Sequence, residues 1–370
     1  MKRVLVVGMT SNPGGLESVI INYIRKIDHM KVVFDFLCTT GTIAYSDEIK
    51  SYNGEIYSIV SKSKQPMIYK KEIRNFFKNN SKNYTAIWVN MNSLTNLDYL
   101  KLAKRYGIKT RIIHSHNSMS MYKGIRNILH RFNRILVEKY ATDFWACSQS
   151  AGKWFYNKKI LNSNSYKVIN NAIDTNKYKF DSAQRSVIRK KYNIKDSDIL
   201  IGHVGRFTPQ KNHERLLEIF KELLEENNNY KLILIGDGEL REKIENKADE
   251  YKIRDKIVFT GIVSDVYNYY SAMDLFLFPS IHEGLSVVAV EVQASGLPIV
   301  ASDVMGDSVK VSDLYFTLNL NESNEKWIKC IKNAKRNDER ERLKYYKIVS
   351  ESDYNIELES KKLEDFFMRR

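Results

Sequence analysis

The sequence has 370 residues, of which 43% are hydrophobic and 28% charged, as in a globular protein large enough for two domains. No apolar run approaches the about 20 residues that span a bilayer, and three widely spaced cysteines (Cys38, Cys147 and Cys330) argue against a disulfide framework or a zinc site. We expect these cysteines to be small buried hydrophobic residues in a reducing cytoplasm. The net charge of +15 is uneven, because residues 1–180 hold 29 Lys and Arg against 11 Asp and Glu and the rest hold 30 against 33. An anionic partner should therefore meet the first half.

The first residues, Lys2 to Gly8, predict a strand that runs into a glycine loop and not a signal peptide. A helix is expected from Leu16 to Ile27. The backbone at Gly14 and Gly15 could approach a ligand closely, although a strand and a glycine turn alone are a weak signal. Further strands are expected at residues 32–37, 55–60, 86–89, 109–114, 143–146 and 166–169. Helical patterns separate most of them, which predicts a parallel α/β sheet with helices on both faces.

Two histidines, His114 and His116, lie at the carboxyl end of the strand predicted at 109–114. Ligands of open parallel sheets bind outside the carboxyl ends of the strands, so this pair is a candidate binding element. A His-x-His pair also occurs in metal sites. No nearby Cys or Asp cluster completes a ligand set here, so a metal is not favoured.

Residues 122–140 predict an amphipathic helix with five cations against Glu138 alone. Most such helices pack on their own sheet, so we expect the apolar residues in the core. The cations could still face an anionic membrane surface, and the two interpretations are compatible. The apolar positions are Ile125, Ile128, Leu129, Phe132, Ile135 and Leu136, and the cations are Lys123, Arg126, Arg131, Arg134 and Lys139.

A polar crossover at residues 170–180 leads into a second strand and helix alternation, at the point where the charge changes. We therefore expect domains at 1–172 and 173–354, with a helix at about 355–370 that could pack back on the first domain. Strands are expected at 199–204, 231–235, 256–259, 274–278 and 298–301, and helices at 213–225 and 239–251.

The loop from Gly205 to Asn212 leaves a predicted buried strand and carries two cations, Arg206 and Lys211. They could converge on a diphosphate, or they could be two solvated loop residues. Asp196-Ser197-Asp198 resembles a metal-binding Asp-x-Asp motif. It directly precedes its strand, so a turn is favoured over a metal site.

The stretch from Pro279 to Asp303 places two glutamates around a predicted helix start. A helix that begins just after Gly284 would offer free N–H groups and a positive dipole end to a diphosphate. Glu283 precedes that helix, and Glu291 lies eight residues on, about 12 Å along its axis. The two carboxylates could hold hydroxyls at both ends of a nucleotide sugar. Alternatively, Glu283 is a helix cap and Glu291 a solvated side chain.

Taken together, these segments resemble family 4 glycosyltransferases of the GT-B fold, in particular the bacterial capsular and exopolysaccharide branch. Each motif is modest, but their order and spacing are specific. The resemblance implies two Rossmann-like β/α/β domains that face each other across a cleft. It rests on NPGGLESVIINY, KVVFDFL, RIIHSHNS, ATDFWACSQSAGKW, GHVGRFTPQKNHE, LILIGDGELRE, FTGIVSDV and FPSIHEGLSVVAVEVQASGLPIVASD.

The resemblance also implies roles for individual residues. Arg206 and Lys211 neutralise the donor diphosphate, Glu283 holds the donor sugar, Glu291 holds the ribose, and His116 approaches the reacting carbon. The base rests against the loop 261–263. The implied donor-binding residues are Gly14, Gly15, Gly205, Gly261, Ile262, Val263, Gly284, Leu285 and Glu291. Two segments depart from the family pattern: Asn170–Asp174, and Met305–Ser308, which lacks a glutamate common in the wider family.

The implied activity is retaining, metal-independent transfer of a hexose or N-acetylhexosamine from a nucleoside-diphosphate sugar, with a UDP-sugar as first candidate and no cofactor. The acceptor would be a saccharide linked to a polyprenyl lipid, reached at the anionic inner face of the membrane. Two alternatives remain. A GT-B sugar-nucleotide epimerase or hydrolase shares the fold, and the basic half could bind nucleic acid, although RNP and zinc-finger patterns are absent.

Overall fold

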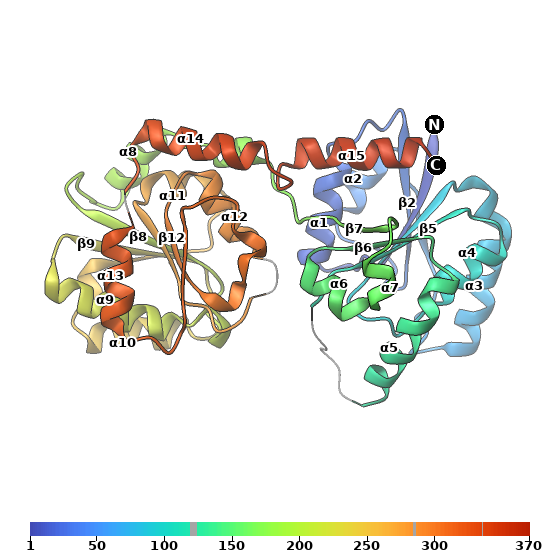
Figure 1. Cartoon of the computed structure of the whole chain (residues 1–370), viewed down its shortest axis with the longest axis horizontal. Helices are drawn as coiled ribbons and strands as arrows, with labels where there is room; N and C mark the ends of the chain where they lie inside the picture. Colours follow the sequence, from blue (N-terminus) through green and yellow to red (C-terminus); the bar gives the residue numbers. More distant parts are fainter. Residues whose placement is uncertain (119–123, 284–285, 335) are drawn as a thin grey trace. The chain divides into compact units, whose positions relative to one another are not determined.

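A computed structural model of the chain describes residues 1–118, 124–283, 286–334 and 336–370, which form two compact units. The first unit contains Met1–Ala172 and Ile356–Arg370, and the second contains Ile173–Asn355 (Figure 1). The first unit holds 31 Lys and Arg against 14 Asp and Glu, and the second holds 28 against 30. The excess positive charge therefore belongs to the first unit.

The first unit is built on a seven-stranded parallel sheet in the order β3-β2-β1-β4-β5-β6-β7. Its strands are β1 (Lys2–Val7), β2 (Val32–Cys38), β3 (Ile56–Ser58), β4 (Ala86–Met91), β5 (Thr110–Ser115), β6 (Asp143–Ala146) and β7 (Tyr166–Val168). The central strands are apolar on both sides because helices cover both faces of a parallel sheet. Every residue of β2 is buried, and its one charged residue, Asp35, pairs with Arg3 at 2.5 Å and accepts the Glu55 N–H.

Helices cover both faces of this sheet and enclose one apolar cluster on each side. One cluster lies under α3, α4, α6 and α7, and the other under α1, α2 and α15. Lys31 on the α1 side pairs with Glu364 of α15 at 2.8 Å, which ties the end of the chain to the first unit. The helices are α1 (Gly15–Ile24), α2 (Ser46–Ser51), α3 (Pro66–Asn80), α4 (Asp98–Arg105), α5 (Ile125–Leu136), α6 (Gln149–Phe155), α7 (Lys158–Leu161) and α15 (Ile356–Met368).

The second unit is built on a six-stranded parallel sheet in the order β10-β9-β8-β11-β12-β13. Its strands are β8 (Ile199–Val204), β9 (Tyr230–Ile235), β10 (Ile257–Gly261), β11 (Leu275–Phe278), β12 (Ile299–Ser302) and β13 (Tyr315–Leu318). The helices are α8 (Ser182–Lys191), α9 (His213–Glu226), α10 (Arg241–Glu250), α11 (Val266–Ala272), α12 (Val287–Ala294), α13 (Asn324–Asn333) and α14 (Glu339–Ser350). Two parallel-sheet α/β units confirm the expected fold class.

Helix α12 is short and almost wholly apolar because it packs between its sheet and α14. It ends at Ala294, and Gly296 follows with a φ of +66°. A Cβ atom at Gly296 would lie 2.4 Å from the Cα atom of Arg342 in α14, so only glycine fits this helix end. The close approach fixes the position of α12 in the core.

Helix α5 does not bury its apolar face, contrary to the expectation from its amphipathic pattern. Its apolar residues do not enter the core: Ile125, Ile128, Phe132 and Ile135 are between 59% and 74% exposed. Only Leu136 packs on the adjoining cluster. The helix packs on its unit through the polar residues that the amphipathic pattern assigns to solvent. Among the described residues, no helix is long and apolar enough to cross a membrane.

Candidate active site

The second sheet reverses its strand order beside β8, whose neighbours are β9 on one side and β11 on the other. All strands are parallel, so their carboxyl ends share one edge of the sheet. Ligands of such sheets bind outside this edge at the point of reversal. The loops that leave β8 and β11 there carry Lys211 and Glu283, two of the predicted site residues.

Lys211 and Glu283 form an ion pair, with Lys211 Nζ 2.7 Å from Glu283 Oε1. Their side chains are only 16% and 7% exposed. The same ammonium lies 4.8 Å from the centroid of the Phe278 ring at the end of β11, a favourable cation–π distance. A cation and a carboxylate are therefore held side by side at the sheet edge.

Two hydrogen bonds join the loops that carry this pair. The Ile281 N–H donates to the Gln210 carbonyl at 2.8 Å, and the Asn212 side-chain amide donates to the Pro279 carbonyl at 3.0 Å. Asn212 has a positive φ of 56°, a conformation that asparagine tolerates better than most residues. The two loops thus form one backbone platform beneath Lys211.

A glycine turn after β9, which was not predicted as part of the site, supports the same platform. A Cβ atom at Gly236 would lie 2.1 Å from the carbonyl oxygen of Gly205, and one at Gly238 would lie 2.6 Å from that of Phe207. At Gly205 itself, a Cβ would lie 3.1 Å from the side-chain carbons of Lys211. Glycines therefore let the turn and the Lys211 stem pack directly against the loop after β8.

Three other residues were predicted to bind the diphosphate here: Arg206, which the structure describes, and Gly284 and Leu285, which it does not. Arg206 is exposed on the same loop and makes no ion pair with a described residue. The structure therefore brings together Lys211 and Glu283 but does not join Arg206 to them. Gly284 and Leu285, whose amides were expected to bind phosphate, lie outside the described residues.

Glu291 lies on α12 and is held by two tyrosines. Tyr178, at the end of the short helix η3 (Thr175–Tyr178), donates to Glu291 Oε1 at 2.8 Å, and Tyr270 of α11 donates to Oε2 at 2.9 Å. Burial raises the pKa of the Glu291 carboxyl, and the two tyrosine hydrogen bonds act against that shift. The tyrosines orient the carboxylate and leave each oxygen a second lone pair for a ligand.

The expected helical spacing of Glu283 and Glu291 assumed a helix that begins earlier than α12 does. Helix α12 begins at Val287 and not just after Gly284, so Glu291 lies on the helix and Glu283 lies in the preceding loop. The estimate of 12 Å along a helix axis therefore does not apply. Glu283 instead takes its position from the loop after β11 and from Lys211.

The loop 261–263 follows β10 at the same edge of the sheet. Gly261 has a φ of +72°, and its carbonyl accepts the Gly236 N–H at 2.9 Å. Ile262 is 81% exposed, whereas Val263 packs partly on the core. The hydrogen bond joins this loop to the glycine turn beneath the platform.

The first sheet reverses its order between β1 and β4, and three predicted residues follow strands near that point. Gly14 and Gly15 are exposed at the start of α1, and a Cβ at Gly15 would meet nothing within 4 Å. His116 follows β5, and its Nε2 lies 2.8 Å from Oδ1 of Asn90 in β4. Burial lowers the pKa of His116 to about 3, so its imidazole is neutral near pH 7. Asn90, which orients this ring, was missed, although a polar residue at the end of a buried strand is a usable signal.

The neighbouring His114 is buried and belongs to the sheet. Its Nδ1 accepts the Trp88 indole N–H at 3.3 Å, and its ring centroid lies 4.1 Å from that of His116. Over the described part of the chain, no three His, Cys, Asp or Glu side chains are grouped as metal ligands. Asp196 and Asp198 lie in a turn, where Asp198 accepts the Lys195 N–H at 2.8 Å.

Comparisons with known proteins agree with this architecture. Residues 184–348 match the family model described as glycosyl transferases group 1. EpsF of Bacillus subtilis (strain 168), which carries a glycosyltransferase designation, is 32% identical over 341 residues, covering 90% of this chain and 88% of its own. A UDP-Gal:alpha-D-GlcNAc-diphosphoundecaprenol alpha-1,3-galactosyltransferase of Escherichia coli is 28% identical over 160 residues, 42% of this chain and 41% of its own.

Among solved structures, Anabaena Alr3699/HepE in complex with UDP superimposes with a TM-score of 0.78 at 17% identity, covering 100% of both chains. WaaG, a glycosyltransferase involved in lipopolysaccharide biosynthesis, gives a TM-score of 0.65 at 16% identity, covering 98% of this chain and 99% of its own. The fold is therefore the GT-B fold of glycosyltransferases. The chain belongs to the group 1 glycosyltransferases, as the sequence motifs indicated, and the protein is a transferase enzyme.

Proposed function

We propose that the protein transfers a hexose or N-acetylhexosamine from a UDP-sugar to a saccharide linked to a polyprenyl lipid, with retention of the anomeric configuration and without a metal ion. The observation that carries the proposal is the Lys211–Glu283 pair at the strand-order reversal of the second sheet. A cation beside a carboxylate suits a ligand that presents a diphosphate next to sugar hydroxyls.

The second unit binds the donor in this proposal. The Lys211 ammonium has three N–H donors, so it can keep its bond to Glu283 and also donate to a phosphate oxygen. Arg206 adds charge from the same loop. The first turn of α12 has no side-chain cap, so its N–H groups and dipole also favour an anion. Glu283 holds the sugar hydroxyls.

The nucleoside part of the donor has its own proposed contacts. Glu291 accepts the ribose hydroxyls with the lone pairs that the two tyrosines leave free. The base rests against the loop 261–263, where Ile262 offers an exposed apolar side chain. UDP bound to Anabaena HepE, a protein of the same fold, supports UDP as the first nucleotide to test.

The chemical step requires no protein nucleophile. The acceptor hydroxyl attacks the anomeric carbon from the face that the diphosphate leaves, the bond from that carbon to the phosphate oxygen breaks, and the hydroxyl proton passes to the departing phosphate. Negative charge grows on the leaving group, so the fixed Lys211 cation stabilises the transition state more than the ground state. His116, neutral and oriented by Asn90, and the turn at Gly14 and Gly15 contact the donor sugar from the first unit.

The proposed acceptor and cellular location are inferred from the positive charge of the first unit and from the Escherichia coli relative. The first unit carries the excess positive charge of the chain, which favours the anionic inner face of a membrane. The Escherichia coli relative acts on a diphosphoundecaprenol-linked sugar, as its name states. We therefore propose a peripheral enzyme of the cytoplasmic membrane surface that extends a lipid-linked saccharide during capsule or exopolysaccharide synthesis. The likeness to a Staphylococcus aureus protein named as a capsular polysaccharide biosynthesis glycosyltransferase, 28% identical over 180 residues, supports this role.

The test is incubation of the purified protein with radiolabelled UDP-, GDP- and ADP-sugars, with and without polyprenyl-diphosphate-linked saccharide. The proposal expects label in the lipid fraction only when acceptor is present. Label released as free sugar at the same rate without acceptor would instead identify a hydrolase, and conversion into a second sugar nucleotide would identify an epimerase. Competition by RNA but not by nucleotide would favour the nucleic-acid alternative.

Metal independence has a separate test. Excess EDTA should leave the transfer rate unchanged, because Lys211, Arg206 and the α12 dipole supply the positive charge. Loss of activity that Mg²⁺ or Mn²⁺ restores would overturn this part of the proposal.

A further inference from the structure

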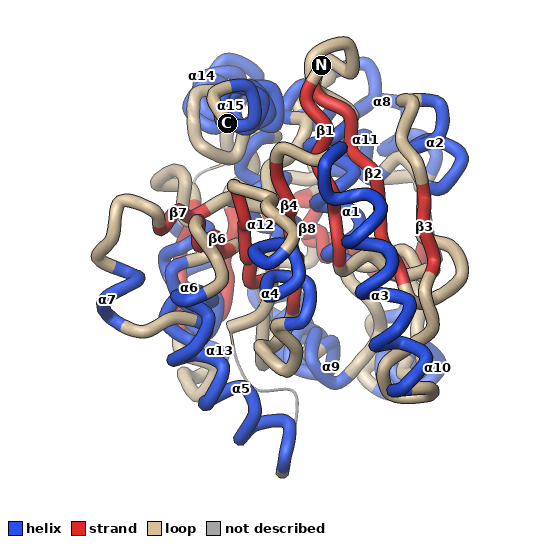
Figure 2. The backbone as a smooth tube through the Cα atoms, turned by 90° about the vertical axis from the view of Figure 1, so that its right-hand side faces the viewer, coloured by secondary structure: helices blue, strands red, loops and turns tan. Residues whose placement is uncertain are grey.

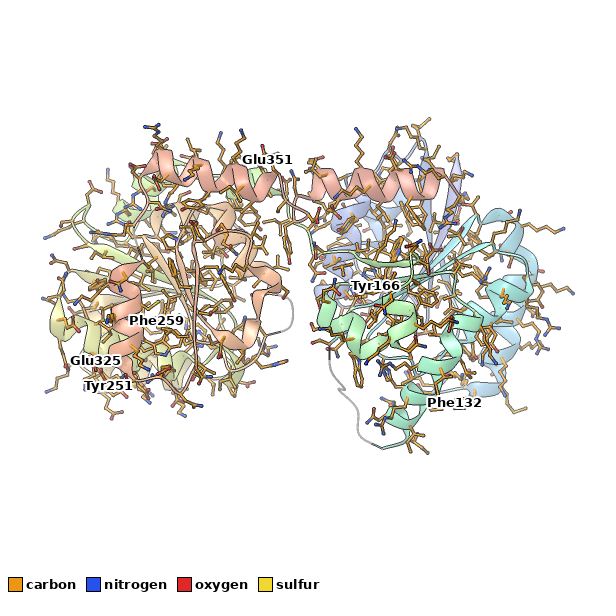
Figure 3. All side chains as sticks on the ribbon, in the orientation of Figure 1. Phe132, Tyr166, Tyr251, Phe259, Glu325 and Glu351 are labelled. Atoms are coloured by element: carbon orange, nitrogen blue, oxygen red, sulfur yellow. The ribbon has the colours of Figure 1, made fainter. Side chains whose placement is uncertain are left out.

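Helix α5 presents an apolar stripe to solvent. We call Ile125, Ile128, Phe132 and Ile135 the outer face of α5; their side chains are 74%, 65%, 59% and 69% exposed. The positions follow the 3.6-residue period of a helix, so they form one continuous strip along it. Figure 3 labels Phe132 on this helix. Scattered exposed apolar residues are ordinary, but a contiguous strip marks an interaction surface.

The opposite side of α5 is fixed to the first unit by polar contacts. The Asn133 side-chain amide donates to the Leu94 carbonyl at 2.7 Å, and His130 Nδ1 accepts the Leu94 N–H at 3.1 Å. The His130 ring also stacks on Trp154 at 4.2 Å. Rotating α5 to bury its outer face would break these contacts. The contacts of Asn133 and His130 therefore keep the outer face exposed.

The charges on α5 indicate what covers the outer face. Residues 125–136 contain three arginines and no acidic residue. Arg131 is exposed and lies three residues after Ile128 and four before Ile135, so it flanks the strip on one side. Arg134 has another role, because its guanidinium donates to the Lys153 carbonyl at 2.8 Å and to that of Tyr156. An apolar strip flanked by Arg131 on a strongly basic unit matches the interface of an anionic bilayer.

The position of α5 in the first unit also agrees with contact between its outer face and a bilayer. The helix follows β5, whose carboxyl end also carries His116. Figures 1 and 2 both show α5 projecting past the strands of its own sheet. The outer face therefore lies on an element that leaves the same sheet edge as the candidate site of the first unit.

We propose that α5 lies in the membrane interface, with its outer face inserted among the lipid chains and Arg131 among the anionic headgroups. The proposal rests on the membrane location proposed above and adds its mode: insertion of apolar side chains, and not attraction of cations alone. Salt screens the charge contribution but does not weaken the burial of apolar area. Attachment should therefore be only partly sensitive to salt.

The first experiment is flotation of the full chain with phosphatidylcholine vesicles that contain phosphatidylglycerol, at about 0.1 M and about 1 M salt, where the Debye length falls from about 10 Å to about 3 Å. The wild type should bind at both concentrations. Ile128→Asp with Phe132→Asp should lower the partition coefficient at least about tenfold at both. Val187→Asp, at an exposed valine of α8 in the second unit, is the matched control and should bind like the wild type. Equal binding by the double variant, or loss of all wild-type binding at high salt, would overturn the proposal.

The second experiment observes insertion directly. Phe132→Trp should gain emission that brominated lipids quench beyond the wild-type level, whereas Val187→Trp should not. Absence of additional quenching at position 132 would contradict insertion. If the strip instead binds a second copy, the wild type will dimerise with concentration, the double variant will stay monomeric, and quenching at position 132 will be absent.

Failure of this inference is distinguishable from failure of the proposed function. Transfer to a short-chain, water-soluble acceptor should be equal in the wild type and the double variant, because none of the residues proposed to contact the donor lies in α5. Transfer with normal vesicle binding by the double variant would refute insertion alone. Vesicle binding without transfer to any acceptor would refute the proposed function and leave the membrane contact standing.

Discussion

Lys211 Nζ lies 2.7 Å from Glu283 Oε1, although the two residues are 72 positions apart in the sequence. The pair exists because β8 and β11 are neighbours at the strand-order reversal, so the loops that follow them meet. One platform thus positions the group proposed to stabilise the leaving diphosphate and the group proposed to hold the sugar.

Lys211→Ala should lower kcat about a hundred- to a thousandfold, because it removes the fixed charge that the proposal aims at the leaving group. Steady-state kinetics at saturating donor, with a thermal melt to confirm folding, measures it. Lys243→Ala is the matched control, because that lysine also pairs with a glutamate at 2.7 Å but is 63% exposed. Equal losses in the two variants would contradict the assignment.

Glu291→Ala should raise the donor KM roughly ten- to a hundredfold and change kcat little, because a ribose contact is felt equally in the ground and transition states. Tyr270→Phe should have the same effect to a smaller degree, since it removes one of the two hydrogen bonds that orient the carboxylate. Isothermal titration with UDP provides an independent check. A normal KM with a collapsed kcat would remove Glu291 from the ribose role.

Gly236→Ala should disrupt the platform, because its Cβ would lie 2.1 Å from the Gly205 carbonyl oxygen and its φ is +138°. We expect a loss of about 2 to 4 kcal/mol in unfolding free energy and weaker donor binding. Gly41→Ala is the control: its φ is +81° but nothing lies within 4 Å of the added Cβ, so only about 1 kcal/mol of backbone strain remains. Similar losses of unfolding free energy in both variants would show that the close approach of Gly236 to Gly205 does not contribute to stability.

The strands could be predicted from the sequence because parallel strands buried on both faces give short apolar runs. The runs at Asp143–Ala146 and Ile199–Val204 coincide with β6 and β8. The edge strand β13 was missed, because its run is only four residues long and only Tyr315 in it is buried. Periodicity showed that α5 has an apolar face but could not show that polar contacts of His130 and Asn133 turn that face outward.

Part of the candidate site could also be predicted from the sequence, again because parallel strands are easily recognised. Lys211 and Glu283 follow predicted strands, so the topology of a parallel sheet brings their loops to one edge. Tyr178 could not be predicted as a partner of Glu291, because it lies 113 residues away in a crossover without a periodic pattern. The start of α12 was placed two residues early, since Gly284 resembles a helix entry but the helix begins at Val287.

The stability of the second unit should fall as the pH falls from about 6.5 to about 4. Burial, and to a lesser extent the positive charge of the neighbouring Lys211, lower the pKa of His213 to about 4. The neighbouring ring of His203 carries no negative charge that would oppose this shift. Between the two pKa values the unfolded chain binds a proton that the folded chain does not, so acid favours unfolding by up to about 3 kcal/mol.

His213→Leu should flatten this pH dependence. Neither ring nitrogen of His213 has a hydrogen-bond partner among the described residues, so the apolar replacement should cost little near pH 7.5 and should stabilise the unit at pH 5 relative to the wild type. Urea unfolding at about pH 7.5 and about pH 5, followed by hydrogen exchange of β8 and β9, measures the effect. An unchanged pH slope in the variant would exclude His213 as its source.

Sugar transfer with retention, and its dependence on Lys211, can be measured together by following one labelled sugar through the reaction. The protein and its Lys211→Ala variant are incubated with a UDP-sugar and a polyprenyl-diphosphate-linked saccharide, and the product linkage is determined by NMR. We expect lipid-linked product with the anomeric configuration of the donor, formed by the wild type and nearly abolished in the variant. Product of inverted configuration, or equal product from the variant, would contradict this expectation.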